Sequence, residues 1–547
     1  TDAATDEDEA QSFEPDLPAT KYDPQTEYVK KILWPMERLK GNELPTSAMD
    51  PAGFTPLGGT AHEKRTVATH IPKWDPEKCI QCFQCSFVCP HAAIRPYLAT
   101  QEELKGAPET FATVPTRMPK LKEQGLQLRI QNYPQDCVGC GSCAYNCPAP
   151  GKALHMEPLE PQLADEKANL QFAQDNISIK DDILPKSSVV GTQMQQPLLE
   201  FSSCCAGCGE TPNVKLLTQL FGDRLIIANA TGCSSIWGGY APALPYTTNK
   251  HGHGPAWGNS LFEDNAEYGY GIMKAVKVRR QKLEQLVGQA LALSDLPADA
   301  AAAMKAWQAG KDDADASFAL GEAVCDVIRP LAEAVGSDAA AGQTSASRVQ
   351  AQQAGQNIYQ QILDHSDMFQ KKSVWAVGGD GWAFDIDYGG LDEVLASKEN
   401  INILVLDTEG YANTGGEMSK ATQLGSLSTF SLDGKDTPKK RLARMVMQYD
   451  YVYVAQVCFG ADMQQIITAL REAEAYDGPS MVIALCPCIS WGIKAGMGTA
   501  VGACKDAVKT GYWTLWRFNP ELAAQGKEPL IIDSATPEGE EALKQFL

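Results

Sequence analysis

Long apolar runs are missing from this sequence, and so is an excess of positive charge. Apolar stretches such as 401–406 and 481–485 are only strand-sized, whereas a membrane-spanning helix needs about 18 apolar residues. The 68 acidic residues outnumber the 47 basic ones, and a net charge of −21 repels nucleic-acid phosphates and anionic lipid surfaces. We therefore expect neither a membrane nor a nucleic acid as a partner.

What is present is a long chain with many cysteines. A chain of 547 residues exceeds what one core supports, so we expect two to four domains. Most of the 17 cysteines fall in short C-x-x-C clusters, which in a chain of this length favour metal ligation in a reducing compartment over disulfides. We expect the cytoplasm, with a mitochondrion-related organelle as the alternative.

The chain divides by composition into five parts. Strand-sized apolar runs at 224–228, 373–377, 401–406, 451–457 and 481–485 alternate with helical stretches, which predicts an α/β domain with a parallel sheet. An Ala-rich helical insertion is expected near 283–367, with breaks at Leu296-Pro297 and Gly336-Ser337. The predicted parts are an acidic tail (1–20), a connecting region (21–69), a cysteine-rich α+β domain (70–160), a polar linker (161–200) and the sheet domain (201–547).

Two cysteine runs of one pattern stand between residues 70 and 160. Both follow the C-x2-C-x2-C-x3-C-P spacing of two-cluster bacterial ferredoxins, in which the fourth cysteine of each run serves the other cluster. A long spacer, 96–136, separates the runs, and a pair of structural zinc sites is the alternative. The expected 4Fe-4S ligand sets are Cys79, Cys82, Cys85 and Cys147, and Cys137, Cys140, Cys143 and Cys89.

Two apolar runs of the sheet domain end in oxygen-rich sequences. The run 373–377 leads to a Gly-Asp-Gly at 379–381, and the run 401–406 leads to Thr408 and then to an Asn-Thr-Gly-Gly at 413–416. Adjacent parallel strands meet at one edge, so Asp380 and Thr408 are expected side by side. Such oxygen ligands suit Mg²⁺ bound to a diphosphate. An ordinary nucleotide-binding α/β domain with an acidic metal site is the alternative.

This order of motifs resembles the diphosphate-binding signature of thiamine diphosphate enzymes. The resemblance implies Mg²⁺ on Asp380, Thr408 and the Gly410 carbonyl, and it brings Asn413 near the reacting carbon. It further implies cofactor contacts from Gly379, Asp380, Gly381, Trp382, Thr408, Glu409, Gly410, Tyr411, Ala412 and Asn413.

Further cysteines are expected at the same edge. Cys205 and Cys208 open the sheet domain, while Cys233 and Cys488 each follow a predicted strand. Four thiolates there would hold a third 4Fe-4S cluster; zinc, or a redox disulfide between Cys205 and Cys208, are the alternatives. The other cysteines of this domain are two neighbours that could substitute, Cys204 and Cys486, and three expected in the core, Cys325, Cys458 and Cys504.

Ordered blocks between about residues 58 and 500 resemble the pyruvate:ferredoxin oxidoreductase family. The blocks are 82–95, 205–212, 232–236, 254–257, 260–267, 379–382 and 413–416. The resemblance implies that Cys205, Cys208, Cys233 and Cys488 ligate the cluster nearest the cofactor. It also implies that Glu210 and Cys233 lie against the thiamine, which makes Glu210 and Asn413 the predicted catalytic residues.

The resemblance implies oxidative decarboxylation of pyruvate with coenzyme A to acetyl-CoA and carbon dioxide. Three 4Fe-4S clusters would pass the electrons to ferredoxin or flavodoxin. The family's pyrimidine-binding domain is not recognised here, so we expect a carboxyl-terminal portion that needs an amino-terminal half or companion chain, with complete units forming a homodimer. The alternatives are an oxidoreductase for another 2-oxoacid, such as 2-oxoglutarate or an indole or branched-chain acid, and a non-catalytic electron-transfer subunit.

Overall fold

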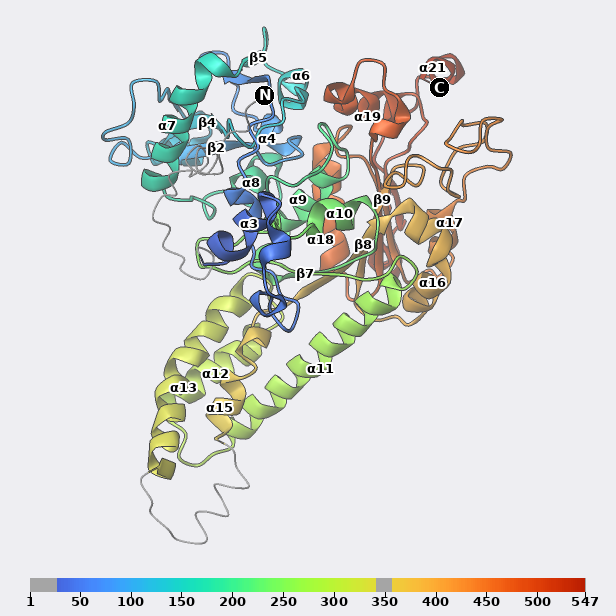
Figure 1. Ribbon diagram of the computed structural model, residues 1–547. Coiled ribbons are helices and arrows are strands. Elements are labelled where there is room, and N and C mark those ends of the chain that lie inside the picture. Colours follow the sequence, from blue (N-terminus) through green and yellow to red (C-terminus); the bar gives the residue numbers. More distant parts are fainter. Residues whose placement is uncertain (1–26, 341–356, 547) are drawn as a thin grey trace.

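The computed structural model describes residues 27–340 and 357–546 (Figure 1). The predicted acidic tail, 1–20, lies outside these residues. Among the described helices, not one combines the length and the apolar character that crossing a bilayer requires.

An eight-stranded sheet forms the centre of the sheet domain, in the order β13-β12-β10-β11-β9-β8-β6-β7. Neighbouring strands pair in parallel from β10 to β7, while β12 and β13 add antiparallel pairings at one edge. Strands β9 and β11 are buried along their whole length, because helices cover both faces. The strands are β6 (Leu225–Asn229), β7 (Ala256–Asn259), β8 (Ser373–Gly379), β9 (Asn402–Asp407), β10 (Tyr453–Val457), β11 (Ser480–Leu485), β12 (Trp516–Phe518) and β13 (Leu530–Ile532).

Helices of this domain pack their apolar faces on the sheet. Every residue of α9 (Thr211–Phe221) is buried, because this helix lies between the sheet and the cysteine-rich domain. The other helices are η5 (Gly222–Arg224), α10 (Cys233–Gly239), η7 (Gly381–Ile386), α16 (Tyr388–Ala396), α17 (Leu442–Met447), α18 (Met463–Ala475), η8 (Ile489–Trp491), η9 (Met497–Thr499), α19 (Ala500–Lys509), α20 (Pro520–Ala524) and α21 (Glu540–Phe546). The α/β fold predicted from the sequence is confirmed.

The cysteine-rich domain contains two small sheets, one that joins its two halves and one formed by the spacer between the cysteine runs. Strand β1 (His70–Trp74) pairs antiparallel with β5 (Leu154–Pro158), and the short helices α4 (Gln84–Phe87) and α6 (Ser142–Asn146) carry Cys85 and Cys143. The spacer between the cysteine runs forms a three-stranded antiparallel sheet and one short helix. Its elements are β2 (Ile94–Ala99), β3 (Val114–Pro115), α5 (Pro119–Glu123) and β4 (Gln127–Asn132).

The predicted linker contains two helices. Helix α7 (Glu160–Asn176) packs on the cysteine-rich domain, where Phe172 contacts Phe111 edge to face and Glu166 pairs with Arg129. Helix α8 (Val189–Met194) follows it. The segment 160–200 therefore belongs to the body of the protein.

The Ala-rich region forms a helical arm that projects away from the sheet (Figure 1). It consists of α11 (Asn265–Leu291), α12 (Ala298–Gly310), α13 (Ala316–Ala340) and α15 (Ile358–Leu363), packed around Trp307 and neighbouring apolar side chains. Pro297 precedes α12 as expected, but the expected break at Gly336-Ser337 is wrong, because the backbone of α13 continues through it. One interior glycine costs a helix only about 1 kcal/mol. The predicted insertion also includes 341–356, outside the described residues.

The described part of the connecting region, from residue 27, is a series of short helical turns. It contains η1 (Val29–Leu33), α3 (Trp34–Glu37), η2 (Gly41–Glu43), η3 (Thr46–Ala48) and η4 (Gly59–His62). Val29 and Leu33 pack on Ala243, and the Gly58 amide donates to the Tyr246 carbonyl. This region is thereby fixed to the sheet domain.

Candidate functional site

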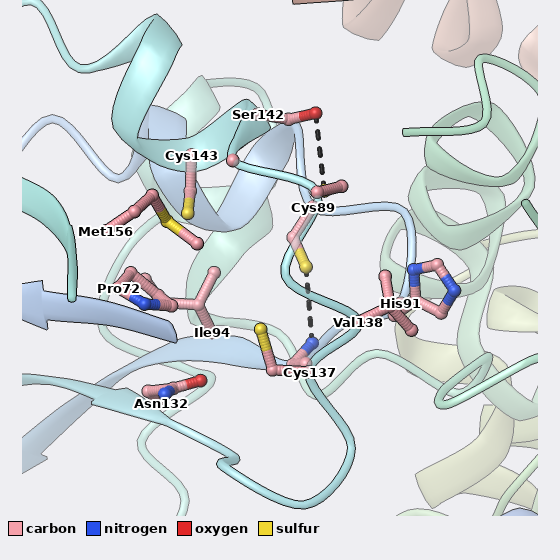
Figure 2. A pocket seen from close by; sticks show the side chains of 13 residues that line it. Pro72, Cys89, His91, Ile94, Asn132, Cys137, Val138, Ser142, Cys143 and Met156 are labelled. Carbon is pink, nitrogen blue, oxygen red and sulfur yellow. Dashed lines mark hydrogen bonds between the residues drawn. The ribbon is translucent and has the colours of Figure 1, made fainter. Parts of the chain in front are cut away.

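Each cysteine run supplies three thiols to one cavity and its fourth thiol to the other. Cavity 1 is lined by Cys89, Cys137, Cys140 and Cys143, and cavity 2 by Cys79, Cys82, Cys85 and Cys147. Figure 2 shows three of the cavity 1 cysteines around the same space. The structure therefore brings together the two four-cysteine sets expected from the crossed ferredoxin pattern.

The chemistry of both cavities fits an iron-sulfur cluster. Burial is the main cause that raises the pKa of the Cys137 thiol to about 12, and the neighbouring thiols of its set contribute to this rise. Bound iron would supply the positive charge that four crowded thiolates require. Each cavity is also lined by a side chain with a buried, unpartnered nitrogen, Asn132 in cavity 1 and Trp74 in cavity 2, and such donors can bond to cluster sulfur.

The predicted magnesium ligands meet where β8 and β9 end, at the carboxyl edge of the sheet. The Thr408 hydroxyl lies 3.0 Å from Asp380 Oδ1 and 3.0 Å from the Gly410 carbonyl oxygen. The Thr408 amide donates to the same carboxylate oxygen at 3.1 Å, and the Ser419 hydroxyl donates to Asp380 Oδ2. Asp380 itself is fully buried.

This arrangement fits a cation. One hydroxyl proton of Thr408 faces two acceptor oxygens, so one acceptor is left without a donor from that group. Burial and the nearby Asp407 raise the pKa of Asp380 to about 7, although its hydrogen bonds to Ser419 and Thr408 act in the opposite direction. Mg²⁺ prefers hard oxygen ligands of this kind.

Other residues predicted to contact the cofactor lie in different surroundings. The Trp382 side chain is buried in the core and donates to Asp387 at 2.6 Å, so only its backbone faces the loop. The Glu409 carboxylate turns away and bonds to Lys439 at 2.9 Å and to Tyr512. Asn413 is exposed on the loop beyond the magnesium ligands.

The remaining residues predicted to contact the cofactor are three glycines, Ala412 and Tyr411. Gly379 ends β8, and Gly410 and Ala412 are partly exposed on the loop. A side chain at Gly381 would meet the Tyr411 ring at 2.4 Å, so glycine is required where these two chain segments cross.

Four further cysteines surround Glu210, and we call them the third cysteine set. Cys205, Cys208 and Cys488 each raise the pKa of the Cys233 thiol, although burial and Glu210 act on it more strongly. Burial raises the pKa of Glu210 to about 7, and Trp237 donates to its carboxylate at 2.9 Å. The structure thus brings the four predicted ligands into the neighbourhood of Glu210, together with Cys204, whose contact is the largest cause that raises the pKa of the Cys208 thiol.

The third cysteine set lies at the carboxyl edge, next to the predicted magnesium ligands. Strand β11 ends beside β9, and the Cys486 amide donates to the Asp407 carbonyl at 2.9 Å. Trp491, just after Cys488, donates to the Thr408 carbonyl at 2.8 Å. The Gly209 amide bonds to the Pro487 carbonyl at 3.1 Å, which joins the loop of Cys205 and Cys208 to that of Cys488.

The third cysteine set also touches cavity 1. Burial raises the pKa of the Cys140 thiol, and the nearby Gly207 amide acts in the opposite direction. His91 lines cavity 1, and its Nε2 lies 3.2 Å from the Cys204 carbonyl oxygen. Three cysteine groups therefore follow one another in space, from the carboxyl edge through cavity 1 to cavity 2.

Alanine at Gly498 is expected to lower stability by about 1–3 kcal/mol, because its Cβ would stand 2.3 Å from the Cys140 carbonyl oxygen. The clash would displace η9 from cavity 1. Gly288→Ala is the control, since a Cβ there meets no atom within 4 Å in helix α11. Thermal unfolding of the full chain measures both variants, and equal midpoints would contradict the close approach.

Three residues that contact the predicted magnesium site or its neighbours were not predicted from the sequence. Ser419 bonds to Asp380, Lys439 pairs with Asp407 at 2.6 Å, and Trp491 fixes the Thr408 carbonyl. None of them belongs to a recognised motif, so only the tertiary structure reveals them. Within the described residues, no three or more His, Cys, Asp or Glu side chains converge on the position of a single metal ion, and the cysteines of cavities 1 and 2 instead surround wider spaces.

Three family models match parts of the chain. Residues 361–484 match the C-terminal TPP-binding domain of thiamine pyrophosphate enzymes, and residues 71–94 match a 4Fe-4S binding domain. Residues 14–68 match EKR, a domain of unknown function, so the connecting region is a recurrent unit.

Relatives match nearly the whole chain. It is 53% identical over 518 residues to a pyruvate:ferredoxin oxidoreductase of Moorella thermoacetica and 47% identical over 526 residues to a pyruvate-flavodoxin oxidoreductase of Klebsiella pneumoniae. These alignments cover 94% and 95% of this chain and 42% of each relative. A mitochondrial pyruvate dehydrogenase [NADP(+)] of Euglena gracilis is 45% identical, over 95% of this chain and 27% of that protein. The chain thus spans about two fifths of the length of the first two relatives.

Proposed function

Since the chain is a homologue of pyruvate:ferredoxin and pyruvate-flavodoxin oxidoreductases, matching part of their length, we propose that it is the cofactor-binding and electron-transfer part of such an enzyme. The complete enzyme would convert pyruvate and coenzyme A to acetyl-CoA and carbon dioxide. Ferredoxin or flavodoxin would accept the electrons. The observation that carries this proposal is the position of the third cysteine set beside Asp380 and Thr408 at the carboxyl edge.

The residues have distinct roles in this proposal. Asp380, Thr408 and the Gly410 carbonyl would hold Mg²⁺, and the segments 379–382 and 408–413 would contact the cofactor. Bound thiamine diphosphate supplies the electron sink for decarboxylation. The Asn413 amide can donate to developing negative charge, and Glu210 and Cys233 would lie against the thiamine.

Each cysteine set holds one 4Fe-4S cluster in this proposal. The contacts of Gly207 with Cys140 and of His91 with Cys204 put cavity 1 between the third cysteine set and cavity 2. Electrons therefore leave through cavity 2. About twelve iron atoms per chain are expected after anaerobic reconstitution, whereas about eight without bound thiamine would support a non-catalytic electron-transfer subunit.

The remainder of the relatives' length is proposed to bind the pyrimidine ring, the substrate and coenzyme A, as an amino-terminal half or a companion chain. Complete units are proposed to form a homodimer. The cytoplasm and a mitochondrion-related organelle both stay predictions.

Pyruvate turnover tests the proposal that the isolated chain is only part of the enzyme. The 547-residue chain, reconstituted with iron, sulfide, Mg²⁺ and thiamine diphosphate, is expected to oxidise no pyruvate. Adding the remainder of the enzyme should give coenzyme A-dependent bleaching of the clusters. Rapid turnover by the isolated chain would contradict the proposal.

A panel of 2-oxoacids tests the substrate in the complete assembly. Pyruvate is expected to bleach the clusters faster than 2-oxoglutarate, indolepyruvate or branched-chain 2-oxoacids. Faster bleaching by one of the others would replace pyruvate by that acid and leave the cofactor assignments intact.

A further inference from the structure

A buried lysine connects the sheet domain to the first cysteine run. Lys215 lies on α9, is 2% exposed, and donates to the carbonyls of Ser86, Phe87 and Cys89, the last two at 3.0 and 2.8 Å. Three carbonyl acceptors match the three N–H groups of an ammonium ion. Within the described part of the chain, no carboxylate lies within the 4.0 Å of an ion pair with this group. Its positive charge is therefore buried and has no acidic partner.

The second cysteine run has a matching lysine. Lys152 donates to the carbonyls of Tyr145 and Cys147, at 2.7 and 2.8 Å. Cys89 and Cys147 hold the same position in their runs, and Cys89 lines cavity 1 whereas Cys147 lines cavity 2. The two lysines thus make the same kind of contact at the two cavities, but Lys152 is exposed and Lys215 is buried.

Burial makes the charge of Lys215 act on a nearby cluster more strongly than the exposed charge of Lys152. Water and salt screen an exposed ammonium group, while a buried one interacts several times more strongly with nearby charges. Reduction adds one electron and no proton to a 4Fe-4S cluster, so a fixed cation stabilises the reduced form and raises the reduction potential.

Other polar groups near the two cavities do not cancel the difference between the buried charge of Lys215 and the exposed charge of Lys152. Side-chain donors are matched, since Asn132 lines cavity 1 and Trp74 lines cavity 2, each with an unpartnered nitrogen. Backbone N–H groups donate to two cavity 1 sulfurs, from Ala93 and Gly139, and to one cavity 2 sulfur, from Ala153, which acts in the same direction as Lys215. The acidic group nearest Cys137 is Asp136, and Lys64 neutralises it at 2.7 Å. The Lys215 charge acts on the Cys89 thiol of cavity 1 more strongly than on the Cys85 thiol of cavity 2, so its net positive charge favours cavity 1.

We propose that Lys215 sets the reduction potential of the cluster in cavity 1 and raises it above that of the cluster in cavity 2. The electron given up by the cluster of the third cysteine set then reduces the cluster in cavity 1, with no proton transferred and no bond formed. This inference depends on the cluster assignments of the proposed function.

Potentiometric titration of the reconstituted full chain, followed by electron paramagnetic resonance, tests the role of Lys215. Lys215→Gln keeps N–H donors but removes the charge, and it is expected to lower one midpoint potential by about 59 mV, a tenfold change for a one-electron couple. Lys215→Arg keeps the charge and should stay near the wild-type value. Lys152→Gln is the matched control, and its potentials should equal those of the wild type.

Iron content distinguishes a failure of the cluster assignments from a failure of the proposed role of Lys215. A wild-type chain that binds no cluster in either cavity would disprove the cluster assignments themselves. A fully loaded Lys215→Gln chain with unchanged potentials, or an equal shift in Lys152→Gln, would overturn the role of Lys215 alone. If the Gln variant loses iron, Lys215→Met is titrated instead, and loss of iron from both neutral variants would leave Lys215 only a structural contact.

Discussion

Asparagine at position 380 is expected to weaken binding of Mg²⁺ and thiamine diphosphate at least about 100-fold, or ~2.7 kcal/mol. The substitution keeps the size of the side chain and an oxygen that accepts from the Thr408 amide at 3.1 Å. It removes the negative charge on which a hard cation depends. Calorimetric titration of the complete assembly with thiamine diphosphate at fixed Mg²⁺ measures the change.

Two variants show whether this effect is specific. Ser419→Ala removes only a hydrogen bond to Asp380, and orientation effects of this kind usually cost about 10-fold or more. Asp392→Asn makes the same change of charge on α16, where the carboxylate accepts from Tyr449 at 2.9 Å, and binding should not change. Equal affinity of the Asp380→Asn and wild-type assemblies would place the metal elsewhere.

The central strands were predictable because strands buried on both faces consist of continuous runs of apolar residues. The five apolar runs form β6, β8, β9, β10 and β11, each within two residues of the predicted bounds. The strands near the two edges of the sheet have a weaker sequence pattern. Strand β7 has the short sequence Ala-Trp-Gly-Asn, and β12 and β13 have three residues each, so pairing with a neighbouring strand defines them more than their own composition does.

Spacing along the chain was enough to identify the groups that meet at the site. Regular cysteine intervals predicted both four-cysteine cavities, and the strand ends predicted that Asp380 and Thr408 would meet. The directions of individual side chains were not predictable. Trp382 and Glu409 lie next to the diphosphate motif in sequence, but packing turns the first into the core and Lys439 turns the second aside.

Serine at Cys205 or at Cys488 is expected to remove one whole cluster, so that iron falls from about twelve to about eight atoms per chain. Loss of one ligand from a four-cysteine set leaves a corner of the cluster unbound. Colorimetric iron analysis gives the count, and electron paramagnetic resonance shows whether the ferredoxin-type clusters remain.

The neighbouring cysteines are matched controls for these substitutions. Cys486 is fully buried, and its thiol donates to the Ala484 carbonyl at 3.3 Å, so Cys486→Ser should keep all the iron. The Cys204 thiol lies 3.4 Å from His91 Nε2 and 3.6 Å from the Thr211 hydroxyl, which gives it polar partners of its own. Cys205 is exposed in the same loop. A loss of four iron atoms from Cys204→Ser, with full iron in Cys205→Ser, would therefore reverse the ligand assignment within this pair.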